Sequence, residues 1–165
     1  MPENKFLYTY KNELYPEYLK HGHAHTYIWP CAIQFCVGNG LDIGGMPDDC
    51  LPGAIPINIK MENGYSAYLL PERKYDFIFS SHTLEHLDDC DSALKCWRDH
   101  IRKDGVLFLY LPHPDMEYWL PTNNKKHLHV FSPGHLALKL KEIGFKQVIC
   151  SERDLFWSFS VVGIR

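Results

Sequence analysis

Five of the ten histidines follow segments that we expect to be buried strands, a placement that suits acid–base chemistry. An imidazole changes its charge near neutral pH, so it can take a proton from a reacting group. We rank His113 first as a general base, because it follows the strand expected at residues 106–111. Asp115 and His82 are the other catalytic candidates, and for each histidine the alternative is a structural residue that holds a loop. The histidines so placed are His82, His86, His113, His127 and His129.

A glycine-rich segment, GLDIGG at residues 40–45, is the second feature that could do chemistry. Glycine lets the backbone approach a ligand where a side chain would block it. Asp42 lies in the expected strand 41–43, near the carboxyl end at which open α/β sheets bind their ligands. The segment predicts a ligand-binding loop, and an ordinary glycine-rich turn is the alternative.

A second group of histidines raises the question of metal binding, and the cysteines indicate the redox state of the protein. His21, His23 and His25 would share one face of an extended segment and could then bind Zn²⁺ or Ni²⁺. We favour a polar leader that packs near the ligand site, and we expect no metal. The six cysteines include no C-x-x-C pair, and several lie in apolar runs, where a free thiol behaves as a small apolar side chain. They indicate a reduced, cytoplasmic protein.

Composition limits the partners. The 165 residues suit one domain, and the chain carries 17 Lys and Arg against 20 Asp and Glu, a formal net charge of −3. Nucleic-acid binders usually carry a basic excess, and a membrane span needs roughly 20 consecutive apolar residues. The sequence has neither feature. We therefore expect a small-molecule partner, with no nucleic acid and no membrane.

Strand-like and helix-like segments alternate along the chain, which predicts an α/β domain with a mostly parallel sheet. We place this domain at residues 26–165, after an irregular leader at residues 1–25. The last two strands are joined by residues 151–157, which are too few for a crossover and fit an antiparallel return. The expected strands are 41–43, 54–59, 66–70, 76–81, 106–111, 145–150 and 158–164, and the expected helices are 27–36, one near 82–87, 91–102 and 132–143.

The chain is similar to the class I S-adenosylmethionine-dependent methyltransferases in four segments: LDIGG, YDFIFSSHTLEHL, IRKDGVLFLYLPHPD and HLHVFSPGHLALKLKEIGF. The similarity covers residues 27–165, and its most specific element is SSHTLEHL. It implies a Rossmann-like fold with a seven-stranded sheet, S-adenosylmethionine as the methyl donor, and a site over the carboxyl ends of the strands. Residues 59–65 are too few for a crossover helix. We therefore expect the strand order 2-1-4-5-7-6, with an antiparallel last strand and at most a short third strand at one edge.

The similarity also implies a set of cofactor-binding residues. Asn58 stands where the family usually has a carboxylate for the ribose hydroxyls, and Ser66 replaces a second acid beside the adenine. Met46 stands where a further loop glycine is expected. Asp42 and Gly44 match the acidic and first glycine positions of the cofactor loop. The complete implied set is Asp42, Gly44, Gly45, Asn58, Ser66, Ala67, Ser80, Ser81 and His82.

This resemblance implies a methyltransferase, and we expect a small-molecule acceptor, such as a sugar or another biosynthetic intermediate. The acceptor would lie between His82 and the long loop at residues 112–131. The departures at Met46, Asn58 and Ser66 support a second hypothesis, a catalytically inactive domain that keeps the fold and binds a partner. A nicotinamide-dependent oxidoreductase is disfavoured, because the sequence lacks G-x-G-x-x-G.

Overall fold

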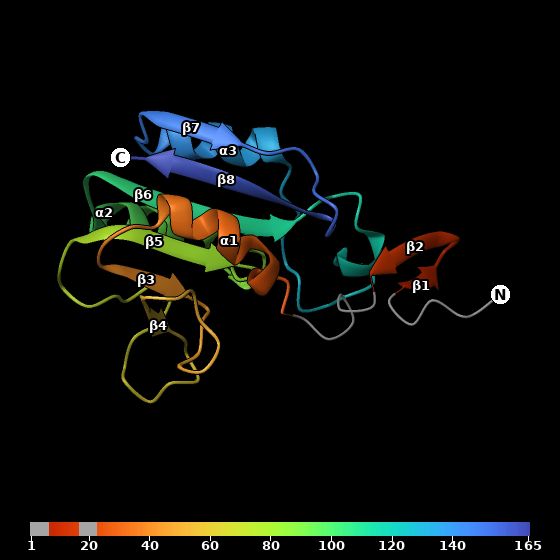
Figure 1. The fold of residues 1–165 in the computed structure, drawn as a ribbon, viewed down its shortest axis with the longest axis horizontal. Coiled ribbons are helices and arrows are strands. Elements are labelled where there is room, and N and C mark those ends of the chain that lie inside the picture. The colour runs from red at the N-terminus through yellow and green to blue at the C-terminus, as the bar shows by residue number, and fades with distance from the viewer. Residues whose placement is uncertain (1–6, 17–22) are drawn as a thin grey trace.

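A computed structural model describes residues 7–16 and 23–165 of the chain. Its centre is a six-stranded sheet with the order β4-β3-β5-β6-β8-β7 (Figure 1). The strands are β3 (Gly40–Ile43), β4 (Ala54–Ile57), β5 (Tyr75–Ser81), β6 (Ile101–Pro112), β7 (Gln147–Cys150) and β8 (Ser158–Ile164).

The directions of the strands agree with the sequence expectation. Strands β3, β4, β5 and β6 pair in parallel, whereas β8 is antiparallel to both β6 and β7. The observed order is the predicted 2-1-4-5-7-6, which confirms both the α/β Rossmann-like fold and its antiparallel finish. The physical cause is the short link at residues 151–157, which can return the chain beside β7 but cannot carry it across the sheet.

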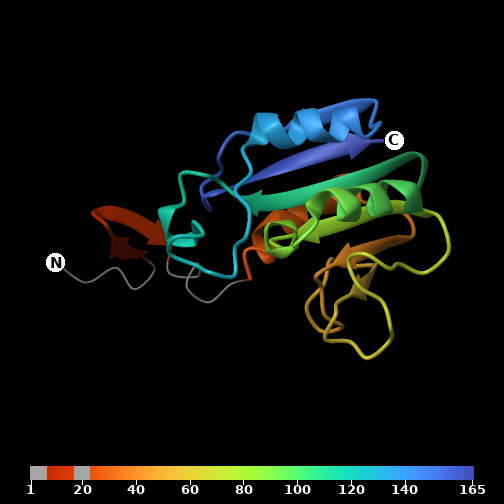
Figure 2. The ribbon, with the colours of Figure 1, turned by 180° about the vertical axis from the view of Figure 1, so that it is seen from behind.

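Helices cover both faces of the sheet. Helix α1 (His25–Phe35) lies on one face, and α2 (Cys90–His100) and α3 (Pro133–Glu142) lie on the other (Figures 1 and 2). Asp89 caps α2 by accepting from the Ser92 amide, and Ser132 caps α3. Among residues 7–16 and 23–165, the helices lack the length and apolar character that a membrane span requires.

Alternate side chains of the central strands fill two cores, one on each face. Phe77 and Phe79 of β5 pack with Phe108 beneath α1, whereas Ile78 points to the opposite face and joins Trp97 of α2. All five side chains are at most 1% exposed. This period of two explains why the central strand is apolar throughout, since helices bury both of its sides.

The third expected strand does not form. Residues 66–70 contain only an isolated bridge between Ser66 and Leu69, so the sheet has six strands where the family resemblance implied seven. The reason is the short connection after β4, which leaves no room for a crossover helix. The link between β3 and β4, residues 44–53, is also a loop without a helix.

The segment before α2 and the end of α2 differ from what the sequence predicted. The helix expected near residues 82–87 is a single 3-10 turn, η2 (Leu84–His86). Helix α2 ends at His100, and β6 begins at Ile101, which pairs with Tyr75 before a bulge in the β5–β6 register. Extended pairing with the neighbouring strand thus replaces the last expected turn of the helix.

A β-hairpin lies within the segment that the sequence suggested was irregular. Strands β1 (Leu7–Tyr10) and β2 (Glu13–Pro16) pair through a turn in which Lys11 and Asn12 have positive φ. Tyr15 is 1% exposed, and its ring centroid lies 4.7 Å from that of Trp157. The hairpin is therefore packed against the start of β8.

Candidate functional site

A cavity of about 670 Å³ opens over the carboxyl ends of β3, β4 and β5. This is the edge at which open α/β sheets bind their ligands. The cavity brings together five of the residues that the sequence implied for a cofactor, together with the neighbouring Thr83 and His86. Those five residues are Gly44, Asn58, Ser66, Ala67 and His82.

Gly44 holds the loop after β3 in a conformation that other residues avoid. Its φ is +103°, and a Cβ built on it would lie 2.0 Å from Oγ1 of Thr83. Its N–H donates to the Ile57 carbonyl over 2.8 Å, which ties the loop to the end of β4. A side chain here would both strain the backbone and collide with the β5 exit.

The buried side chain of Asp42 also holds this loop. Its carboxylate is 4% exposed, and Oδ2 accepts from the Leu51 amide at 2.7 Å. The nearby Gly45 amide also favours the charged form of this carboxyl group. Burial raises the pKa of Asp42 to about 7, against the opposing effect of these amides. The Asp42 carboxyl group therefore stabilises the backbone of the loop.

Asn58 joins β4 to the glycine loop. Its Nδ2 donates to the Gly44 carbonyl at 2.7 Å, and its Oδ1 accepts from the Lys60 amide at 3.0 Å. Ser66 accepts from the Tyr68 amide through Oγ at 3.2 Å. Both side chains border the cavity while making these local bonds.

The two serines at the end of β5 have different roles. Ser80 is 2% exposed and donates to the Ile43 carbonyl at 2.9 Å, so it fastens β5 to β3. Ser81 has a buried Oγ with no hydrogen-bond partner among the described residues. It lines a smaller space of about 60 Å³ beside the main cavity, with His25, Asp42, Gly44, Gly45, Met46 and Asp49.

His82 borders the main cavity and also contacts the first residue of β8. Its φ is +47°, and its Nε2 lies 3.1 Å from Oγ of Ser158. The ring packs edge-on against Trp119. Burial lowers the pKa of His82 to about 3, with the nearby His127 and His86 acting in the same direction. The imidazole is therefore neutral at pH 7.

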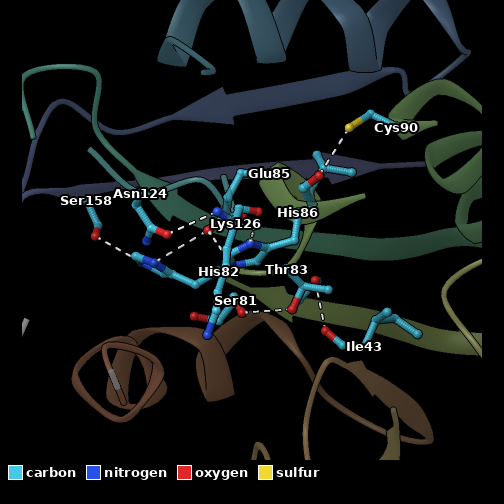
Figure 3. A network of polar contacts seen from close by, with 12 residues as sticks. Ile43, Ser81, His82, Thr83, Glu85, His86, Cys90, Asn124, Lys126 and Ser158 are labelled. Carbon is cyan, nitrogen blue, oxygen red and sulfur yellow. Dashed lines mark hydrogen bonds and ion pairs between the residues drawn. The ribbon is translucent and has the colours of Figure 1, made fainter. Parts of the chain in front are cut away.

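Glu85 is a buried carboxylate that the sequence analysis did not assign to the site. It is 1% exposed, and its Oε1 lies 3.6 Å from Nδ1 of His82 and 3.9 Å from Nε2 of His86 (Figure 3). Within the described chain, neither oxygen accepts a hydrogen bond from another residue. Burial raises the pKa of Glu85 to about 8. The available sequence signal was its position between His82 and His86 after a strand end.

The long loop after β6 encloses only a very small space. His113, Trp119 and His127 line it together with Glu85, and its volume is about 10 Å³. The loop includes the 3-10 turn η3 (Glu117–Trp119). The main cavity, by contrast, reaches this loop at Lys126 and is bordered by His82, so the acceptor position expected between His82 and the loop stays a prediction.

His113 and Asp115 lie away from the main cavity. Nδ1 of His113 accepts from the Asp115 amide at 3.2 Å, and its ring packs edge-on against Phe159. The Asp115 carboxylate is exposed and forms an ion pair with Arg153. Of the three catalytic candidates, only His82 borders the main cavity.

The histidines at the start of α1 contact an acid that the sequence analysis did not connect with them. Nε2 of His25 lies 2.7 Å from Oδ1 of Asp49, and Nδ1 of His23 lies 3.1 Å from its Oδ2. His21, the third member of the expected group, lies outside the described residues. The structure therefore brings His23 and His25 to the loop between β3 and β4.

Comparisons with known proteins agree with this geometry. Residues 20–150 match the protein family described as "Methyltransferase domain". A methyltransferase from Archaeoglobus fulgidus, described as SAM-dependent, has a TM-score of 0.64 and 17% identity over 90% of this chain and 97% of its own. One from Thermotoga maritima, also described as SAM-dependent, has a TM-score of 0.61 and 16% identity over 89% and 92% of the two chains. None of the curated proteins matches.

Proposed function

The chain belongs to the methyltransferase domain family, whose methyl donor is S-adenosylmethionine, and we propose that it methylates a small polar molecule at the cavity over β3, β4 and β5. A sugar or another biosynthetic intermediate is the acceptor class that we propose. The observation that carries the proposal is the cavity itself, which gathers the glycine loop, the β4 end and the β5 exit at one edge of the sheet.

The residues at this edge fit the cofactor. Asn58 and Ser66 would hold the ribose and adenine side, where each keeps a polar atom at the cavity wall. The unpartnered Oγ of Ser81 supplies a polar contact for the amino-acid side, beside Gly44 and Gly45. We assign Asp42 and Ser80 to positioning, because their side chains are occupied by the backbone. When bound, S-adenosylmethionine supplies a methyl group on a positively charged sulfur.

The protein's own contribution to transfer is to position the acceptor and to exclude water. His82 is our first candidate for orienting the acceptor, since its neutral ring borders the cavity and is fixed by Ser158. A pKa of about 3 makes this ring a weak base, so positioning suits it better than proton removal. His113 and Asp115 stay predictions as proton acceptors, and they require the loop at residues 112–131 to open.

The cavity favours a small acceptor. Its volume falls in the range of about 300–1,000 Å³ typical of small-molecule sites. Its wall mixes the apolar side chains of Ile43 and Ile57 with the charged side chains of Lys60, Lys126 and Asp88. Two lysines beside an aspartate do not form the basic stripe that nucleic-acid binding usually requires, so the wall suits a small polar molecule better.

Cofactor binding tests the site through Gly44. We expect S-adenosylhomocysteine to bind the wild type with micromolar affinity, on the order of 7–8 kcal/mol, in calorimetry. Gly44→Ala would move Thr83 and strain the loop, so binding becomes at least about tenfold weaker. Gly53→Ala is the matched control, because Gly53 also has positive φ (+83°) but has no atom near its Cβ position. Absence of binding at millimolar ligand in the wild type contradicts the assignment.

An assay of methyl transfer distinguishes an active methyltransferase from an inactive binding domain. Asn58 is the observation that favours an inactive binding domain. Its neutral side-chain amide bonds to Gly44 and stands where the family usually has a carboxylate. The measurement is transfer of labelled methyl groups from S-adenosylmethionine to a panel of sugars and other small hydroxyl and amine compounds. Transfer to one of them supports the proposal. Cofactor binding without transfer to any of them supports the inactive binding domain.

A further inference from the structure

Three imidazoles converge on the buried Glu85 carboxylate. Glu85 and His86 belong to η2, and His82 precedes it (Figure 3). His127 comes from the loop after η3. The ligand atoms of Glu85, His86 and His127 all lie within 4.8 Å of one another. Glu85 is 1% exposed, and neither of its oxygens accepts a hydrogen bond from another described residue, a costly arrangement that a cation bound to these oxygens would relieve.

Hydrogen bonds on the outer side of each ring fix which nitrogen faces Glu85 in the neutral tautomer. Nδ1 of His86 lies 2.7 Å from the Lys126 carbonyl, which only accepts, so this nitrogen carries the proton. Nε2 of His86 then presents a lone pair toward Oε1 of Glu85, 3.9 Å away. A lone pair of His86 therefore faces an oxygen of Glu85 across a gap that a cation could fill.

His82 repeats this arrangement. Oγ of Ser158 lies 3.4 Å from the Phe156 carbonyl and donates to it, so it accepts from Nε2 of His82 at 3.1 Å. Nδ1 of His82 is then the free nitrogen, 3.6 Å from Glu85.

We propose that Glu85, His86 and His127 bind one divalent transition-metal ion of the Zn²⁺ class. Metal-bound histidines usually donate their outer nitrogen to a carbonyl or another acceptor, as His86 does to the Lys126 carbonyl. Imidazoles with a carboxylate suit Zn²⁺, Co²⁺ or Fe²⁺, whereas Mg²⁺ prefers oxygen donors. Tetrahedral bonds of about 2.0–2.1 Å place donor atoms about 3.3 Å apart, so small side-chain movements close the present separations.

The His23, His25 and Asp49 group is a weaker candidate for the same ion. Its carboxylate oxygens already lie at hydrogen-bond distance from the two imidazoles, and His23 is exposed. Its members nevertheless provide the control that identifies the site.

The test is metal binding by the chelator-treated full-length chain, without cofactor or acceptor. We expect one equivalent of Co²⁺ to bind with visible absorption bands of a nitrogen-ligated ion, and Zn²⁺ to displace it and raise the melting temperature. Glu85→Gln and His127→Ala each weaken binding at least about 100-fold, since losing even an outer-shell partner costs about 10–100-fold. Mg²⁺ produces no shift. His25→Ala with Asp49→Asn binds Co²⁺ as the wild type does.

The Glu85→Gln variant also shows whether a loss of metal binding results from misfolding. This neutral side chain keeps the shape of glutamate and removes the buried carboxylate, so the metal-free variant should melt no lower than the metal-free wild type. Absence of Co²⁺ and Zn²⁺ binding by the wild type overturns the proposal, and so does equal binding by Glu85→Gln. Loss of binding only in the His25→Ala, Asp49→Asn variant assigns the ion to the other group and also overturns it.

Discussion

At the scale of single residues, the site is built from polar side chains that serve the backbone before they serve a ligand. Asp42 holds the Leu51 amide in the loop after β3, and Asn58 ties that loop to β4. Ser81 and Glu85 are the exceptions, since each has buried polar atoms without a partner in the described chain. We therefore propose that a bound ligand completes the environment of these two residues.

Asn58→Asp tests whether the amide is required by the loop. A carboxylate oxygen would face the Gly44 carbonyl at about the position of the donor nitrogen, and the hydrogen bond would become a repulsion. We expect the free energy of unfolding to fall by about 1–3 kcal/mol in urea denaturation. Asn63→Asp is the control, because Asn63 only accepts, from the Tyr65 amide. Tighter cofactor binding with unchanged stability in Asn58→Asp would contradict this role.

Asp42→Asn predicts a change in the pH dependence of stability. The pKa of Asp42 is raised in the folded state to about 7, from an unfolded value near 4. The folded state therefore holds this proton more tightly, and the wild-type free energy of unfolding falls as pH rises from about 4 to 7. Asn does not titrate, so the wild-type minus variant difference should fall by on the order of 3 kcal/mol across this range.

The measurement is urea denaturation of both proteins at several pH values. Asp49, Cys36 and Cys50 face the same carboxyl group and are present in both proteins, so their contributions largely cancel in the difference. A difference that does not change between pH 4 and 7 would mean that Asp42 titrates normally in the folded chain.

At the scale of elements, the lengths of the connections decide what the sheet becomes. The link between β7 and β8 permits only an antiparallel return, and the segment after β4 is too short to add a parallel strand. The missing third strand leaves residues 59–70 as a loop that borders the cavity on its β4 side. Short elements also place the metal-binding candidates, since η2 is a single turn between β5 and α2.

The cap of α2 gives a prediction at this scale. Asp89 accepts from the Ser92 amide at 2.9 Å and from the Ser92 hydroxyl at 2.6 Å. Asp89→Ala leaves the first turn of α2 without its acceptor, and we expect a loss of about 1 kcal/mol in chemical denaturation. Lys95→Ala, an exposed position on the same helix, should change stability by less than about 0.5 kcal/mol. Equal effects of the two substitutions would show that the cap contributes nothing.

At the scale of the whole molecule, the sheet joins two cores into one unit. Phe108 lies in the core beneath α1, and Leu136 lies in the core beneath α3, and both are fully buried. The strands that carry one core carry the other on their opposite face. We therefore propose that residues 26–165 unfold as a single domain, as the sequence suggested.

Substitutions on the two faces test this cooperativity. Phe108→Ala should lower stability by about 3–5 kcal/mol and Leu136→Ala by about 2–5 kcal/mol, each within one transition. Scanning calorimetry should give equal calorimetric and van't Hoff enthalpies for both variants. Leu155→Ala is the control, because Leu155 is 88% exposed. Two separate transitions in either variant would contradict a single unit.

The order of apolar strands and polar helices was enough to predict the fold, including its antiparallel end. These features depend on local periodicity and on connection length, both of which are readable from sequence. The family resemblance implied a larger set of cofactor residues, and five of them, Gly44, Asn58, Ser66, Ala67 and His82, line one cavity at the carboxyl edge of the sheet. Family membership followed from the same segments, and the comparison with known families confirms it.

Only the tertiary structure decided which polar groups are already occupied. Sequence spacing placed His113 after a strand end, but the packing of its ring on Phe159 keeps it from the main cavity. Asp49 meets His25 from 24 residues away, and His127 meets Glu85 from 42 residues away. Loop conformation brings these pairs together, and it follows no short-range period in the sequence. Burial then sets their protonation, which is why the neutral His82 and the unpartnered Glu85 became visible only in three dimensions.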